Sequence, residues 1–128
     1  MVMKNTPPSA LINWANSIES RNPELMTSLY SNNAILLATY EDIAIGHNEI
    51  YKYFIDFLDK QNLQCELLEN YNENTLNNNV IIASGIYKFS FIDNYEEFIE
   101  VFARYSYVFS FDGLILNHHS SLLPSQSE

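Results

Sequence analysis

The stretch FIEVFARYSYVFSFDGLILNHHSSLLP, residues Phe98 to Pro124, decides the fold of this 128-residue chain. Phe98–Phe111 is rich in aromatic and β-branched residues and contains neither glycine nor proline, which predicts one long strand. Asp112-Gly113 is typical of a tight hairpin turn, because glycine tolerates the positive φ that such a turn requires. A second strand from Leu114 to about Ser121 is then expected to return alongside the first, so the stretch predicts a β-hairpin.

Side chains alternate between the two faces of a strand, and this alternation predicts the composition of each face of the hairpin. On the first strand, the face toward the core is expected to consist of Val101, Ala103, Tyr105, Tyr107, Phe109 and Phe111. Its opposite face is expected to consist of Phe102, Arg104, Ser106 and Val108. On the returning strand, one face groups Ile115, Asn117, His119 and Ser121, and the other groups Leu114, Leu116, His118 and Ser120. The two adjacent histidines are therefore predicted to point apart.

Helices and further strands are expected before the hairpin. Apolar residues at helical spacing predict helices over residues 9–20, 23–30 and 49–60, with Ser9, Asn22 and Asn48 as their N-caps. Short runs of apolar and β-branched residues predict strands over 34–39, 64–69 and 80–91, with a polar loop over 70–79. Gly85 is expected to mark a bulge in the last of these strands, and Asp93-Asn94 to turn the chain into the hairpin.

Composition indicates a single globular domain over residues 9–124, with a flexible tail at 1–8 and a short one at 125–128. The formal net charge of -10 makes nucleic acid and anionic lipid surfaces unfavourable partners. No apolar run approaches the length of a membrane span. The single cysteine, Cys65, excludes an internal disulfide framework and fits a reducing compartment, so we expect a cytoplasmic protein.

The order helix, helix, strand, helix and then strands predicts an α+β fold with helices on one side of a curved antiparallel sheet. ARYSYVF and NHHSSLLP in the hairpin resemble signatures of the calcium/calmodulin-dependent kinase II association domain, as do LYSNNAILLAT, GHNEIYKYFIDFL and ASGIYKFSF upstream. That family belongs to the NTF2-like, SnoaL-like superfamily, and the resemblance implies its cone-shaped fold. Another small α+β sandwich, cystatin-like or ferredoxin-like, is the alternative fold.

The histidines do not predict a metal site. A zinc ion needs about three protein ligands that converge on one point, whereas neighbours on a strand diverge. His118 or His119 is therefore either a buried structural imidazole or a pocket histidine beside Ser120 or Ser121, and no metal or cofactor is expected. His47, in a turn, is expected to be solvated. Cys65 has no basic neighbour in sequence and is expected to be a core residue rather than a nucleophile.

Two other groups of polar residues are candidates for ligand binding. Lys88, Ser90, Arg104 and Ser106 share one face of the sheet by alternation, where they form either an anion site or a surface with paired charges, the second being the preferred interpretation. Tyr87, Tyr105 and Tyr107 belong to the apolar face, and their hydroxyls need partners when buried. They are expected to give a pocket a polar floor.

The family's NHHSS-bearing members include the metal-free iota-class carbonic anhydrases. Carried over to this chain, that resemblance implies a bicarbonate-sized pocket formed by Tyr105 and the run His118, His119, Ser120 and Ser121. The family's threonine has no direct counterpart: Ser90 is the nearest hydroxyl, and Lys88 stands where relatives often have threonine. A histidine would have to act as the general base of carbon dioxide hydration.

Two functions from different classes follow. One is a domain whose polar pocket binds a small molecule or anion and which self-associates as a homodimer or higher oligomer. The alternative is a metal-free carbonic anhydrase; a SnoaL-like isomerase or cyclase would need a pocket Asp or Glu, and the sequence places none. Self-association is expected through the outer sheet face, which carries Val80, Ile82, Ile86, Phe102 and Val108.

Overall fold

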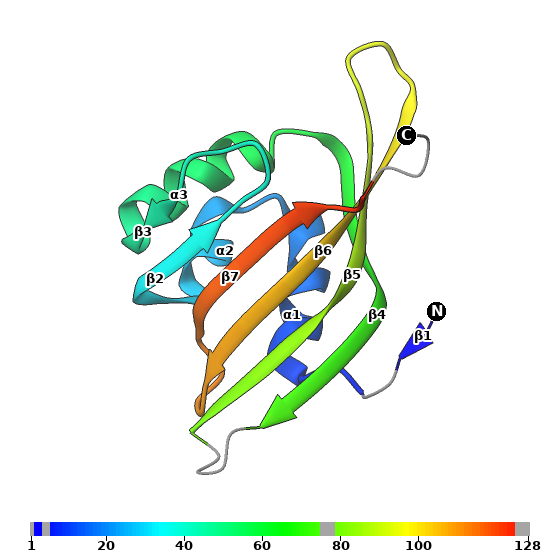
Figure 1. The fold of residues 1–128 in the computed structure, drawn as a ribbon. Coiled ribbons are helices and arrows are strands. Elements are labelled where there is room, and N and C mark those ends of the chain that lie inside the picture. The colour runs from blue at the N-terminus through cyan, green and yellow to red at the C-terminus, as the bar shows by residue number, and fades with distance from the viewer. Residues whose placement is uncertain (1, 4–5, 75–78, 125–128) are drawn as a thin grey trace.

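The computed structural model describes residues 2–3, 6–74 and 79–124, and it has the predicted α+β architecture. Helices cover one face of a strongly curved 7-stranded sheet with the strand order β1-β4-β5-β6-β7-β2-β3 (Figure 1). The strands are β1 (Val2–Met3), β2 (Tyr30–Leu37), β3 (Ala44–Ile45), β4 (Gln61–Asn74), β5 (Val80–Ile92), β6 (Phe98–Ser110) and β7 (Ile115–Leu122). The helices are α1 (Ser9–Ser17), the 3-10 turn η1 (Ile18–Ser20), α2 (Pro23–Ser28) and α3 (Gly46–Phe57).

The predicted hairpin is confirmed as β6 and β7, and its turn is longer than expected. The Ser110 N–H donates to the Leu114 carbonyl at 2.8 Å, so Phe111, Asp112 and Gly113 form a three-residue loop rather than a two-residue turn. Gly113 has φ +90°, a conformation that glycine adopts without strain. Phe111 therefore lies in the loop and is exposed, whereas it was predicted to lie on the core face.

A β-bulge in β7 changes which of its side chains face the core. Val108 of β6 pairs with Asn117, but the next residue, Phe109, pairs with Ile115. Leu116 is thus an extra residue, and the alternation shifts by one position there. Ile115, His118 and Ser120 consequently share the inner face, so the prediction that grouped Ile115 with His119 was wrong. The two histidines do point apart, because His118 is buried and His119 is exposed.

The sheet is mixed, whereas a purely antiparallel sheet was expected. β2 pairs with β7 in parallel, with Leu36 opposite His118, and the short β1 pairs with β4 in parallel. Parallel strands cannot be joined by a short hairpin, and in both pairs a long stretch of chain separates the two strands. The parallel edge matters for the site because it lays β2 beside the His118–Ser120 segment. β1 lies inside the segment that was expected to be a tail.

The helices mostly follow the predicted pattern, with corrected starts. Leu11, Trp14 and Ala15 of α1 are buried, but Pro8 rather than Ser9 is its N-cap residue. The Asn22 side chain caps α2 as predicted, by accepting from the N–H groups of Glu24 and Leu25 at 3.0 and 3.2 Å. α3 begins at Gly46, so Asn48 lies within it and is not its cap. Tyr30 was predicted to end the second helix and instead begins β2.

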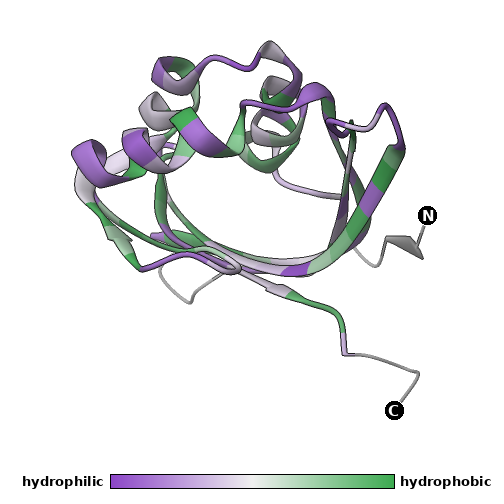
Figure 2. Ribbon diagram, turned by 90° about the horizontal axis from the view of Figure 1, so that it is seen from above, coloured by the Kyte–Doolittle hydropathy of each residue, from purple (hydrophilic) through white to green (hydrophobic). Residues whose placement is uncertain are grey.

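Gly85 lies opposite a bulge rather than forming one. Leu67 of β4 pairs with Tyr87 and Glu69 pairs with Ile86, so the extra residue, Leu68, is on β4. A Cβ atom on Gly85 would lie 2.0 Å from the Glu69 carbonyl oxygen and 2.8 Å from the Tyr105 hydroxyl. Only glycine fits this close approach of the backbone and the Tyr105 hydroxyl. The sheet curves beneath the helices (Figure 2). No helix among the described residues is long and apolar enough to cross a membrane.

Candidate functional site

A cavity of about 330 Å³ lies between the helices and the concave face of the sheet. Its walls are largely aromatic and come from α1, α3, β5 and the residues around them: Trp14, Tyr53, Phe57, Tyr87, Phe89 and Phe91. Polar residues occupy its two ends. Tyr87 and His118, which are buried, lie at the inner end with Thr39 and Ser120, whereas Glu41 and Asp56 are exposed and mark the mouth.

His118 is held at the inner end by hydrogen bonds to both of its ring nitrogens. Its Nδ1 lies 2.8 Å from the Tyr30 hydroxyl, and its Nε2 lies 3.1 Å from the Tyr87 hydroxyl. The indole N–H of Trp14 donates to the same Tyr30 hydroxyl at 3.1 Å. The imidazole also stacks on the Tyr107 ring, with 4.0 Å between ring centroids. The His118 ring, which belongs to β7, is therefore contacted by residues of α1, β2, β5 and β6.

Burial keeps these groups uncharged. Desolvation, with a smaller contribution from His119, lowers the pKa of His118 to about 3, so its imidazole is neutral at physiological pH. Desolvation likewise raises the pKa values of Tyr30 and Tyr87, which keep their hydroxyl protons. Beside this group, the Thr39 hydroxyl donates to Ser120 at 3.4 Å. The inner end is thus lined by neutral donors and acceptors.

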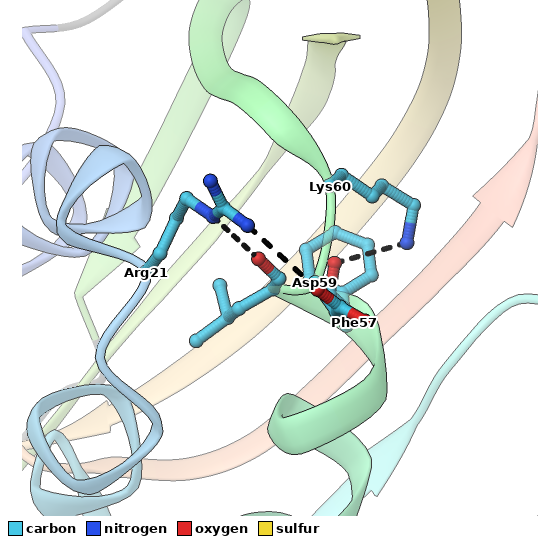
Figure 3. Close-up of polar contacts among 5 residues, drawn as sticks. Arg21, Phe57, Asp59 and Lys60 are labelled. Atoms are coloured by element: carbon cyan, nitrogen blue, oxygen red, sulfur yellow. Dashed lines mark hydrogen bonds and ion pairs between the residues drawn. The ribbon is translucent and has the colours of Figure 1, made fainter. Parts of the chain in front are cut away.

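Two cations contact the C-terminal end of α3, beside the cavity (Figure 3). The Lys60 ammonium donates to the Phe57 carbonyl at 2.9 Å and lies 4.7 Å from the centre of the Phe57 ring. Partial burial lowers the pKa of Lys60. On the other side, Arg21 donates to the Leu58 carbonyl at 3.0 Å. Both cations satisfy carbonyl groups that have no partner within the helix, and Lys60 lines the cavity.

Among the residues singled out from the sequence, the structure brings Tyr87, His118 and Ser120 together in the cavity. Tyr105 is buried, but it does not line the cavity: its hydroxyl lies 2.8 Å from the Glu69 carbonyl and 2.7 Å from the Asn70 side-chain oxygen. Tyr107 packs against His118, and within the described part of the chain its hydroxyl is the buried side-chain polar atom without a hydrogen-bond partner.

The remaining candidates lie on the outer face of the sheet. His119 pairs with Ser106, Ser121 pairs with Arg104, and Ser90 pairs with Glu100, at positions whose side chains alternate with the buried ones. The geometry therefore does not combine Tyr105 with His119 or Ser121 in one pocket. The proposed arrangement of these residues around bicarbonate has no support in the distances, and the roles assigned to them stay predictions.

The preferred interpretation of the outer basic residues is confirmed for Lys88. Its ammonium lies 3.0 Å from a Glu100 oxygen and 3.4 Å from a Glu66 oxygen. These carboxylates neutralise Lys88, which therefore does not present a free anion site. Exposed ion pairs of this kind contribute little to stability.

Several residues of the site were missed by the sequence analysis: Trp14, Tyr30, Thr39, Tyr53 and Lys60. Trp14 was recognised as a core residue of its helix, but the hydrogen bond of its indole depends on Tyr30. Tyr30 and Thr39 approach His118 and Ser120 because β2 runs parallel to β7, and no local pattern predicts that pairing. Glu41 and Asp56 also line the cavity, where the sequence had placed no acidic residue.

The described His, Cys, Asp and Glu side chains were also considered as metal ligands, and Cys65 as a nucleophile. Over residues 2–3, 6–74 and 79–124, no group of three or more His, Cys, Asp or Glu side chains could hold a metal ion. Cys65 is half-buried beside the core, and desolvation raises the pKa of its thiol. A thiol with a raised pKa is a poor nucleophile, which agrees with its predicted structural role.

No family model matches the sequence, and no curated protein is significantly similar to it. Solved structures are similar. A Xanthomonas campestris protein named for the calcium/calmodulin-dependent protein kinase II association domain is 27% identical, with a TM-score of 0.84 over 98% of this chain and 94% of that one. A Streptomyces avermitilis protein named as a dehydratase of the NTF2-like family is 13% identical, with a TM-score of 0.79 over 91% of this chain and 93% of that one.

The chain has the NTF2-like fold. An NTF2-like superfamily protein of Salmonella enterica, 14% identical, also matches, with a TM-score of 0.77 over 93% of this chain and 89% of that one. The expectation of a cone-shaped α+β fold related to the association domain is confirmed. In this NTF2-like fold, residues of α1, α3 and the sheet line the cavity.

We predict that His118 makes the stability of the protein fall as the pH is lowered below about 6.5. The unfolded chain binds a proton on His118 below that pH, whereas the folded protein does so only near its lowered pKa of about 3. Stability is therefore lost on acidification at up to about 1.4 kcal/mol per pH unit from this group. Urea unfolding between pH 7 and 5 measures the loss.

The matched variants are His118→Gln and His119→Gln, which change neighbouring residues on opposite faces. The difference in unfolding free energy between the parent and His118→Gln should shrink as the pH falls, while His119→Gln, which keeps the buried imidazole, should retain a loss of stability on acidification. Parallel curves for the parent and His118→Gln would show that His118 does not titrate differently in the two states.

Proposed function

We propose that this NTF2-like protein binds a small, mostly apolar organic molecule in the cavity, with a polar group of the ligand directed at Ser120 and Tyr87. The observation that carries the proposal is an aromatic-walled cavity with one cluster of oriented polar groups at its buried end. Ligand sites commonly combine apolar walls with a few fixed polar groups, in volumes of roughly 300–1,000 Å³.

Size and charge favour an organic molecule over an inorganic anion. The volume of about 330 Å³ is several times that of bicarbonate, and most side chains around it are apolar. Glu41 and Asp56 lie at the mouth, and the Lys60 ammonium already donates a hydrogen bond to the Phe57 carbonyl. A small anion would therefore enter past two carboxylates and find few charged partners inside.

Carbon dioxide hydration, the alternative function, has less support. A general base should have a pKa near the working pH. The pKa of His118 is lowered to about 3 and both of its ring nitrogens have hydrogen-bond partners, while His119 lies on the outer face. The resemblance to metal-free carbonic anhydrases therefore does not extend to a histidine base in this cavity.

Binding can be followed with Trp14, the single tryptophan of the chain and a residue that lines the cavity. We predict that bicyclic aromatic compounds of the size of indanone change the Trp14 fluorescence with saturation below millimolar concentration. Ala38→Phe, which adds a ring to the cavity lining, should weaken binding at least tenfold, about 1.4 kcal/mol.

The control for that experiment is Ser121→Ala, on the outer face of β7, which should leave binding unchanged. Melting temperatures of both variants show that they are folded. Failure of the parent protein to bind any member of the series, or equal binding by Ala38→Phe, would refute a ligand role for the cavity.

We also propose that the protein self-associates through the outer face of the sheet, opposite the helices. Helices cover the other face only (Figure 2). On the outer face, Ile82 and Phe102 are 36% and 42% exposed, and Val80, Ile86 and Val108 are partly exposed beside them. Exposed apolar side chains gathered on one sheet face are typical of interaction sites, and closed symmetric dimers are the commonest form of homo-oligomer.

Light scattering tests the assembly proposal. We predict a mass of at least two chains for the parent and a shift to the mass of a single chain for Phe102→Glu, because the change buries an unpaired charge in the interface. Tyr95→Glu, at the exposed turn before β6, is the control and should keep the parent mass. A monomeric parent at high protein concentration would contradict the proposal.

A further inference from the structure

Lys60 lines the cavity, and its surroundings differ from those of the other described lysines. Lys88 lies on the outer sheet face, where Glu66 and Glu100 pair with it. Lys52 lies on the exposed side of α3. No carboxylate among the described residues forms an ion pair with Lys60. Its amino group is therefore held at the cavity without a carboxylate in contact.

The amino group of Lys60 is positioned by a backbone carbonyl and by two aromatic rings. It donates to the Phe57 carbonyl at 2.9 Å, and its Nζ lies 4.7 Å and 5.8 Å from the centres of the Phe57 and Phe91 rings. Both rings line the cavity. An ammonium group carries three hydrogens, and the hydrogen bond to Phe57 uses one of them. The nitrogen therefore has positions left for a ligand at the cavity wall.

Partial burial makes this amine more reactive than a fully solvated one. Desolvation lowers the pKa of Lys60, and smaller opposing effects come from the nearby carboxylates of Asp59, Asp56 and Glu41. A lowered pKa increases the fraction of neutral amine at neutral pH, and the neutral amine is the form that attacks a carbonyl carbon. Desolvated lysines in apolar pockets are accordingly suited to Schiff-base chemistry.

We propose that Lys60 forms a Schiff base with an aldehyde or ketone group of an aromatic ligand in the cavity. The inference rests on the proposed function and adds a covalent step and a ligand class to it. The neutral Nζ attacks the carbonyl carbon, and the resulting carbinolamine expels its oxygen as water to give a protonated imine. The ammonium and the carbonyl compound thus become an iminium ion and water, with no net change in protons and no oxidant or reductant.

The product retains the contacts that Lys60 already makes. A protonated imine keeps one N–H for the Phe57 carbonyl, and it keeps a positive charge beside the Phe57 and Phe91 rings. The carboxylates of Glu41 and Asp56 at the mouth favour the same charge. The aromatic part of the ligand then lies against the apolar walls. The ligand class is therefore an uncharged aromatic aldehyde or ketone.

Reductive trapping tests the proposal. The full chain is incubated with 2-naphthaldehyde and sodium cyanoborohydride, which reduces an imine to a stable secondary amine, and peptide mass spectrometry locates the adduct. We expect Lys60 to be labelled roughly tenfold or more faster than Lys52 and Lys88. Excess 2-naphthalenemethanol, which has the same ring system but no carbonyl group, should suppress the labelling of Lys60 and leave that of Lys52 unchanged.

The matched variants are Lys60→Arg and Lys52→Arg. Arginine keeps the positive charge and can donate to the Phe57 carbonyl, but its guanidinium stays charged and does not form the imine. Lys60→Arg should therefore lose the fast-labelled site, whereas Lys52→Arg should keep it. Ala38→Phe, which adds a ring to the cavity lining, should slow the labelling of Lys60 without changing that of Lys88. Melting temperatures show that the variants are folded.

Calorimetry with 2-naphthalenemethanol separates the two proposals, because this alcohol can bind without forming an imine. If the alcohol does not bind the parent protein, the ligand role of the cavity falls and the Schiff-base proposal falls with it. If the alcohol binds but Lys60 is labelled no faster than Lys52, or the alcohol does not suppress the labelling of Lys60, the cavity remains a ligand site and the Schiff-base role of Lys60 is wrong.

Discussion

The structure depends on one buried imidazole that must keep two hydrogen bonds. His118 lies under the helices. Leaving either ring nitrogen without a hydrogen-bond partner there would lower the free energy of unfolding by about 1–3 kcal/mol. Tyr30 and Tyr87 supply those partners, and Trp14 connects Tyr30 to α1. The network therefore fixes α1, β2 and β5 against β7, and the position of the helix layer over the sheet follows from it.

The hairpin, the amphipathic helices and the inward face of β5 were predictable because each depends on residues close in sequence. The bulge at Leu116 was not, since no glycine or proline marks it, and it decides that Ile115 and His118 share a face. Tyr30 is the clearest failure. Its local pattern favoured a helix end, and only the parallel pairing of β2 with β7, between segments far apart in the chain, brings it to His118.

The candidate site was predicted in part for the same reason. His118 and Ser120 were singled out from their motif and do line the cavity, but Tyr105 and Ser121 were assigned to it without knowledge of the neighbouring strands. The Tyr105 hydroxyl donates instead to the Glu69 carbonyl in the bulged part of β4, next to Gly85. The cavity has a neutral, ordered inner end and a charged mouth, and this division favours an uncharged ligand with one polar atom at its buried end.

The central claim is that Tyr30, His118 and Tyr87 act as one network. A double-mutant cycle of Tyr30→Phe and Tyr87→Phe, measured by urea unfolding at pH 7, tests it most directly, since His118 lies between the two hydroxyls. We predict that the double variant loses less stability than the sum of the single variants, with a coupling energy of about 0.5–3 kcal/mol. Additivity within about 0.3 kcal/mol would show that the two tyrosines act independently and would contradict the account.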